Sequence, residues 1–156
     1  MFMMNEETIV RTYADMVYKI AYRYVANPTD ADDVFSETFL TYFKKERTFH
    51  DEEHRKAWLI RVTINCAKDL LTSKSPWEEL NEATAGEATP ALYPEEHIDL
   101  HKAIQQLRLE YREAISLYYL DGLSVQDISA VLGRSENTVK THLARGREKL
   151  RKFLEV

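Results

Sequence analysis

Apolar residues in the first 72 positions recur at helical spacing in three stretches that polar residues separate. The first stretch runs from Thr8 until Pro28 interrupts it. Thr29, with Asp32 three residues later, predicts a capping box at the start of the second helix. The third stretch covers residues 52–71. The expected core residues of these three helices are Ile9, Tyr13, Met16, Val17, Ile20, Ala21, Tyr24, Val34, Phe35, Phe39, Phe43, Ala57, Ile60, Ile64, Ala67 and Leu71.

Residues 95–156 show the same spacing in four stretches and contain two further helix starts. One helix is predicted from Tyr111 to Leu120, and Ser124 predicts a cap at the start of the next. Gly133 occupies the position where a helix C-cap favours a left-handed residue, and Ser135 is predicted to cap the last helix. A short capped helix, a glycine turn and a longer capped helix predict a helix-turn-helix. Its inward-facing residues are expected to be Val139, Leu143, Leu150 and Phe153.

Residues 73–94 lack this periodicity and contain three prolines, one glycine and four glutamates. Such a composition is typical of a linker and cannot support a core of its own. We therefore expect an all-α protein with two small helical domains, residues 1–72 and 95–156, joined by a flexible acidic linker.

The overall composition excludes several classes of protein. The chain has 156 residues, of which 44% are hydrophobic and 30% are charged, as in soluble globular proteins. No apolar stretch approaches the roughly 20 residues of a membrane span, so no membrane insertion is expected. The acidic start at residues 1–7 does not have the basic end of a signal peptide, and we expect a cytoplasmic protein. Cys66 is the only cysteine, and four glycines leave no phosphate-binding loop, so neither cofactor nor enzymatic activity is expected.

Two histidine pairs have the i, i+4 spacing that zinc sites use: His50 with His54, and His97 with His101. In "HDEEH", however, Asp51 stands where the metalloprotease motif requires glutamate, and no third ligand is evident. We expect exposed histidines and no metal. A helical zinc hydrolase is the enzymatic alternative.

The charge distribution indicates nucleic acid despite a net charge of −5. Residues 134–152 hold seven basic and two acidic side chains, and a local basic stripe determines binding more than the total charge does. Short polar residues at the start of the last helix suit base edges, whereas the basic residues towards its end suit phosphates. The alternative is a solvated, charged helix within a bundle.

The third predicted helix carries a second polar stripe, about 100° from its core stripe. This stripe contains Trp58, Arg61, Asn65 and Lys68, which combine an aromatic ring, two cations and an amide. Phe49 and Trp58 are candidate platforms on which an unstacked base of single-stranded DNA could rest. Alternatively, Trp58 fills the edge of the core and the cations are solvated.

Three segments carry a resemblance to a known family. They are "YADMVYKIAYRYVANPTDADDVFSETFLTYFKK", "RKAWLIRVTINCAKDLL" and the final segment from "LHKAIQQLRLEYREAISLYYLDGLSVQDIS" through "AVLGRSENTVKTHLARGREKLRKFL". In this order they resemble bacterial RNA polymerase sigma factors of the extracytoplasmic-function (ECF) type, over nearly the whole chain. The resemblance implies promoter-specific transcription initiation with core RNA polymerase.

The resemblance also implies a role for each candidate site residue. Those expected to dock on the polymerase β′ clamp are Asp32, Asp33, Glu37, Thr38 and Phe39. Those expected to capture and read the melted promoter −10 element are Phe49, His54, Trp58, Arg61, Asn65 and Lys68. Those expected to contact the −35 element are Ser135, Glu136, Asn137, Thr138, Lys140, Thr141, Arg145 and Arg147.

Further partners follow from the same resemblance. These are the β flap of core polymerase, promoter DNA and an anti-sigma factor. The acidic linker would either occupy a cationic polymerase channel as a nucleic-acid mimic or act as a solvated tether. The main alternative function is a stand-alone helix-turn-helix regulator that binds operators as a homodimer; it would bind two symmetric half-sites without polymerase.

Overall fold

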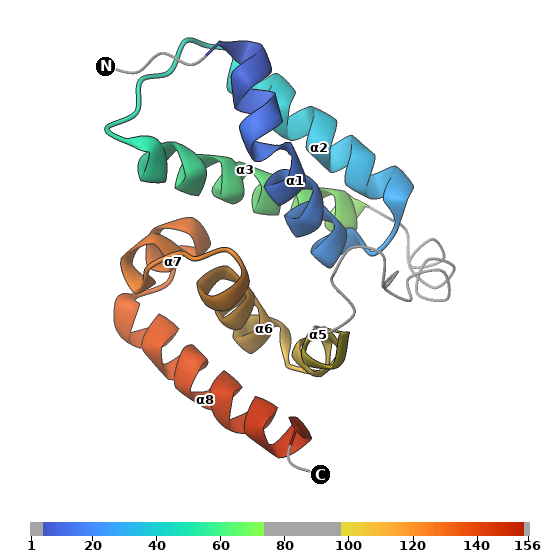
Figure 1. The fold of residues 1–156 in the computed structure, drawn as a ribbon, viewed down its shortest axis with the longest axis vertical. Coiled ribbons are helices and arrows are strands. Elements are labelled where there is room, and N and C mark those ends of the chain that lie inside the picture. Colours follow the sequence, from blue (N-terminus) through green and yellow to red (C-terminus); the bar gives the residue numbers. More distant parts are fainter. Residues whose placement is uncertain (1–4, 74–97, 155–156) are drawn as a thin grey trace. The chain divides into compact units, whose positions relative to one another are not determined.

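The computed structural model describes residues 5–73 and 98–154, and each regular element found there is helical (Figure 1). The chain divides into two units, residues 1–89 and 90–156. The all-α prediction is therefore confirmed. The predicted linker, 73–94, lies outside the described residues except for Ser73, which ends a helix.

The first unit is a three-helix bundle made of α1 (Glu6–Val25), α2 (Pro28–Phe43) and α3 (Glu52–Ser73). Each helix packs against the other two, as Figure 1 shows. A core cluster that joins the three helices contains Ile9, Tyr13, Val17, Phe39 and Leu59.

The second helix begins earlier than the capping-box prediction placed it. Asn27 is the N-cap, and its Oδ1 accepts a hydrogen bond of 2.9 Å from the Asp30 backbone amide. Pro28 takes the first helical position, where its missing N–H costs nothing and its fixed φ already suits a helix. The predicted cap, Thr29, is therefore an exposed residue within the first turn.

The buried faces of the helices differ from the expected stripes at several positions. Six of the expected core residues are only half-buried: Met16, Tyr24, Phe35, Phe43, Ala57 and Leu71. Leu59 and Thr63 are fully buried instead, because α3 packs against both α1 and α2 and so buries more than one stripe. The Thr63 hydroxyl is satisfied inside the core by donating to the Leu59 carbonyl at 2.7 Å.

The second unit consists of α5 (Ile98–Gln105), α6 (Leu109–Ile115), η3 (Ser116–Leu120), α7 (Val125–Leu132) and α8 (Glu136–Leu154). The stretch predicted as one helix, 111–120, changes at Ser116 from α-helix to a π-helical turn. The long helix α8 packs against α5, α6 and α7. Gly146 allows α8 to approach α6 closely, because a Cβ added there would lie 2.7 Å from Ile115 Cγ1.

The helix-turn-helix forms as its capping residues predict. Ser124 Oγ accepts a hydrogen bond of 3.1 Å from the Asp127 amide, and Gly133 adopts the left-handed conformation with φ 68°. Ser135 Oγ accepts a hydrogen bond of 3.1 Å from the Thr138 amide at the start of α8. Phe153 was wrongly expected to be buried on the inner face: it is 43% exposed and lines an open hollow beside α5.

Candidate nucleic-acid and polymerase interfaces

The outward face of α8 presents all the residues predicted to contact the −35 element. Each of the eight is exposed: Ser135, Glu136, Asn137, Thr138, Lys140, Thr141, Arg145 and Arg147. Internal hydrogen bonds order part of this face, since Thr141 Oγ1 donates to the Asn137 carbonyl at 3.0 Å. Arg147 is also held, because its Nη1 donates to the Tyr119 hydroxyl at 3.0 Å. The cations Lys140 and Arg145 project from this face into solvent.

Arg134 begins the basic stretch in the sequence but does not belong to this face. Its Nη2 donates to Glu113 Oε1 at 2.5 Å, and its Nη1 donates to the Glu110 carbonyl at 3.3 Å. The Glu113 side chain is only 2% exposed and that of Arg134 is 21% exposed, so this is a largely buried ion pair between the turn and α6. Arg134 therefore connects the turn of the helix-turn-helix to α6.

His142 lies on the side of α8 that packs against α6. Its ring meets Tyr111 edge-on at 5.5 Å between centroids. Burial lowers the pKa of His142, and the nearby charge of Arg134 lowers this pKa further. The imidazole is therefore neutral at physiological pH.

In the first unit, an aromatic cluster forms where the end of α2, the segment that follows it and the start of α3 meet. It consists of Tyr42 from α2, Phe49 from the segment, and His54 and Trp58 from α3. Phe49 stacks on Tyr42 at 6.0 Å with an interplanar angle of 13°. Trp58 meets Phe49 at 6.0 Å, and His54 meets Phe49 edge-on at 5.4 Å. The two predicted base platforms, Phe49 and Trp58, are therefore neighbours, and both are half-buried.

Two arginines that the sequence reasoning missed cover this cluster. The guanidinium carbon of Arg47 lies 4.3 Å from the centroid of the Trp58 ring. That of Arg55 lies 5.2 Å from the centroid of the Phe49 ring. Arginines interleaved with aromatics around residues 47–58 were the available signal, because guanidinium groups stack on rings.

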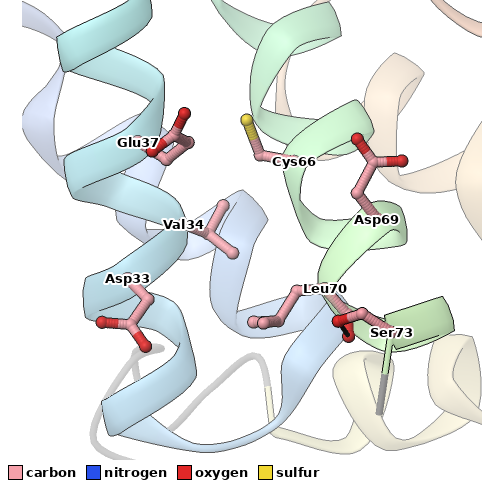
Figure 2. Close-up of a pocket in the computed structure, with 7 residues that line it drawn as sticks. All are labelled: Asp33, Val34, Glu37, Cys66, Asp69, Leu70 and Ser73. Carbon is pink, nitrogen blue, oxygen red and sulfur yellow. Dashed lines mark hydrogen bonds between the residues drawn. The ribbon is translucent and has the colours of Figure 1, made fainter.

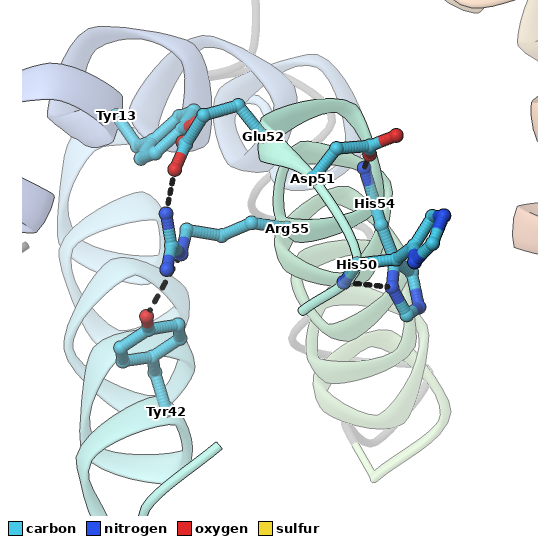
Figure 3. Close-up of polar contacts among 7 residues, drawn as sticks. All are labelled: Tyr13, Tyr42, His50, Asp51, Glu52, His54 and Arg55. Atoms are coloured by element: carbon cyan, nitrogen blue, oxygen red, sulfur yellow. Dashed lines mark hydrogen bonds and ion pairs between the residues drawn. The ribbon is translucent and has the colours of Figure 1, made fainter. Parts of the chain in front are cut away.

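A polar network anchors this segment to the bundle (Figure 3). Arg55 is buried, pairs with Glu52, and donates through Nε to the Tyr42 hydroxyl at 3.2 Å. The Tyr13 hydroxyl in turn donates to Glu52 Oε2 at 2.5 Å. Burial raises the pKa of Tyr13, so its phenol stays protonated and available as a donor. The network connects all three helices beside Phe49.

The histidines of "HDEEH" serve the start of α3 in this structure. Asp51 Oδ1 accepts a hydrogen bond of 2.8 Å from the His54 amide, and the His50 amide donates to His54 Nδ1 at 3.3 Å (Figure 3). The expectation of exposed histidines was wrong for His101, which is 8% exposed, while His97 is outside the described residues. Within residues 5–73 and 98–154, no group of three or more candidate ligands could hold a metal ion.

The polar stripe of α3 continues from the aromatic cluster along one side of the helix. Arg61 and Asn65 are exposed, whereas Trp58 and Lys68 are half-buried. Lys68 Nζ lies 5.9 Å from the centroid of the Tyr24 ring. All six residues predicted for the −10 element, including Phe49 and His54, therefore lie along α3 and the segment that precedes it.

The predicted polymerase-docking residues on α2 separate into two groups. Asp32, Asp33 and Glu37 are exposed, as a docking face requires. Thr38 and Phe39 are 0% and 6% exposed, so their predicted direct contact is corrected: both face the core. Leu40, which the sequence reasoning did not single out, is 63% exposed.

A groove between α2 and α3 adjoins this exposed face (Figure 2). Asp33 and Glu37 line it from α2, and Cys66 and Asp69 line it from α3. Burial raises the pKa of the Cys66 thiol; the Thr38 hydrogen bond lowers this pKa, and the carboxylates of Glu37 and Asp69 raise it. The thiol is therefore protonated at neutral pH.

Comparison with known proteins identifies the family. Residues 9–76 match the model of sigma-70 region 2, and residues 97–150 match that of sigma-70 region 4. The chain is 33% identical over 162 residues to the ECF RNA polymerase sigma factor SigW of Bacillus subtilis, with 94% of this chain and 87% of SigW covered. The chain belongs to the ECF family of RNA polymerase sigma factors.

Further relatives agree with this assignment. The ECF sigma factor SigE of Mycolicibacterium smegmatis is 32% identical over 157 residues, which cover 95% of this chain and 61% of SigE. This ECF sigma factor thus spans less than two thirds of that relative. The stand-alone-regulator alternative gains no support, because these relatives are sigma factors and both sigma-70 regions are matched.

Solved structures show the same fold. The sigma factor RpoE of Bartonella quintana, crystallised with the anti-sigma factor NepR, aligns with a TM-score of 0.75 and 22% identity over 96% of both chains. CnrH, solved with the cytosolic domain of CnrY, aligns with a TM-score of 0.63 and 25% identity over 96% of this chain and 87% of CnrH. In the described part of this ECF sigma factor, no helix is long and apolar enough to cross a membrane.

Proposed function

We propose that the two units of this ECF sigma factor divide promoter recognition between them. As a sigma factor, the protein directs core RNA polymerase to promoters. The second unit would read the −35 element as duplex, and the first would dock on polymerase and hold the melted −10 strand. The observation that carries this proposal is a pair of surfaces with nucleic-acid-binding chemistry: an exposed polar face on α8, and a partly exposed face on α3 with the aromatic cluster.

The −35 role rests on the exposed polar start of α8. A recognition helix places such residues in the major groove, where each bidentate contact to a base is worth roughly 1–3 kcal/mol. We expect Lys140→Ala or Arg145→Ala to weaken holoenzyme binding to −35 duplex by that amount, measured by fluorescence anisotropy. Lys102→Ala, an exposed cation on α5, is the control and should bind normally. Normal binding by both α8 variants would show that another face reads the DNA.

The −10 role rests on the aromatic cluster and the α3 stripe. Opening a duplex costs free energy, and stacking one extruded base on a ring recovers roughly 1–3 kcal/mol of it. We expect Trp58→Ala to leave closed-complex binding unchanged and to slow promoter opening about tenfold or more. Permanganate reactivity of −10 thymines measures opening. Wild-type reactivity in the variant would contradict the platform role of Trp58.

Docking on polymerase would use the exposed face of α2 against the β′ clamp, while the second unit would contact the β flap. Asp32, Asp33, Glu37 and Leu40 supply this α2 face, with Thr38 and Phe39 supporting it from the core. An anti-sigma factor is the expected regulator, as in the RpoE–NepR complex. The protein would act in the cytoplasm, beside core polymerase, without a catalytic step of its own.

A further inference from the structure

The Arg47 guanidinium lies over the plane of the Trp58 ring, with its carbon 4.3 Å from the ring centroid. The other aromatic neighbours of this ring meet it at steep angles: Tyr42 at 73° and Phe49 at 63°. Trp58 also packs against the core cluster of the bundle, and among the described residues the guanidinium is the cation that lies over its ring. An unstacked base would need the same face, because bases bind aromatic platforms by stacking.

The contacts that hold Arg47 in this position are weak. Its Nη2 donates to the Thr41 carbonyl over 3.3 Å, near the upper limit for a hydrogen bond. Its Nε is buried and has no hydrogen-bond partner among the residues that the structure describes. A buried donor without a partner is unfavourable, so the guanidinium would gain solvent or an acceptor when it leaves.

We propose that Arg47 is a placeholder for the promoter base. In the free protein it covers Trp58, and the extruded −10 base displaces it and takes its position on the ring. This proposal rests on the −10 role of Trp58 proposed above. A planar cation suits the task, because it stacks on the ring like a base but remains well hydrated once displaced.

The size of the expected effect follows from the stacking contact. A partly exposed cation–π contact corresponds to roughly a two- to fivefold change in an equilibrium constant. Removing Arg47 therefore frees the platform and should strengthen capture of the melted strand by that factor. A residue whose main task is to bind phosphate would behave in the opposite way, since its loss weakens binding.

The test measures holoenzyme binding to a fork-junction promoter whose −10 non-template strand is single-stranded, taken from a promoter selected by run-off transcription. We expect Arg47→Ala to bind this probe two- to fivefold more tightly, and the gain to disappear in the Trp58→Ala background. Lys45→Ala is the matched control, because Lys45 is an exposed cation of the same segment and makes none of the ring contacts found among the described residues. It should bind equally or more weakly.

A second measurement uses the free protein. In a Trp77→Phe background, Trp58 is the only tryptophan, and Arg47→Ala should increase quenching of its fluorescence by acrylamide. Weaker or unchanged fork-junction binding by Arg47→Ala, while Trp58→Ala still impairs binding, would overturn the placeholder alone. Unchanged binding by Trp58→Ala would overturn the −10 platform and the placeholder together.

Discussion

Replacing Phe39 with alanine is expected to destabilise the first unit by roughly 3–5 kcal/mol, the cost of truncating a buried phenylalanine. The ring is 6% exposed and packs against Phe35 at 4.9 Å and Phe43 at 6.3 Å between centroids. Polymerase binding would then be lost because α2 no longer has a bundle to support it. The loss of stability is measured in the full chain by hydrogen exchange of the α1–α3 amides at increasing urea concentrations.

The neighbouring residue provides the matched control. Leu40 is 63% exposed, so Leu40→Ala should change stability by no more than about 0.5 kcal/mol. If the α2 face docks on polymerase, the same change should weaken binding to the β′ clamp about fivefold or more, as expected for an apolar interface residue. A Leu40→Ala protein that binds β′ at wild-type strength would refute this docking face.

Replacing Arg134 with methionine is expected to destabilise the second unit by roughly 3 kcal/mol, because it removes the cation paired with a buried carboxylate. The Glu113 side chain is 2% exposed and accepts a hydrogen bond of 2.5 Å from Arg134, so the variant loses a charge-assisted contact to a buried carboxylate. Protection of α6 and α8 amides against hydrogen exchange in the full chain measures the loss.

A double variant separates the contribution of this ion pair to stability from the contribution of side-chain packing. Adding Glu113→Gln to Arg134→Met removes the uncompensated charge and should recover more than half of the lost stability. Arg151→Ala, an exposed arginine of α8, should be nearly neutral. If Arg134→Met is as stable as Arg151→Ala, the ion pair does not hold the helix-turn-helix in place.

The helix-turn-helix could be predicted in detail because its signals are local. Ser124, Gly133 and Ser135 each define a helix end through their own side chain or backbone freedom, and the structure confirms all three. The predicted start of α2, with Thr29 as its cap, was wrong for a related reason. Asn27 and Pro28 provide a second local solution, and periodicity alone cannot choose between two caps two residues apart.

Burial within the first unit was less predictable. Spacing identifies one stripe on a helix, but α3 is covered by two helices, and this brings Leu59 and Thr63 inside. On α2, Phe39 and Leu40 are adjacent apolar residues with opposite environments, and only the packing of the bundle reveals which one is available to a partner. The contacts of Arg47 with Trp58 and of Arg55 with Phe49 likewise depend on the path of the segment before α3, which the spacing of residues does not define.

Transcription reconstituted from purified components tests the central claim most directly. The protein would be added to core RNA polymerase on a fragmented genomic library, with run-off products mapped and binding of the protein alone to the same DNA measured in parallel. We predict defined start sites that depend on both components, and weak binding by the protein alone. No association with core polymerase, together with tight binding of the free protein to symmetric duplex sites, would contradict the account.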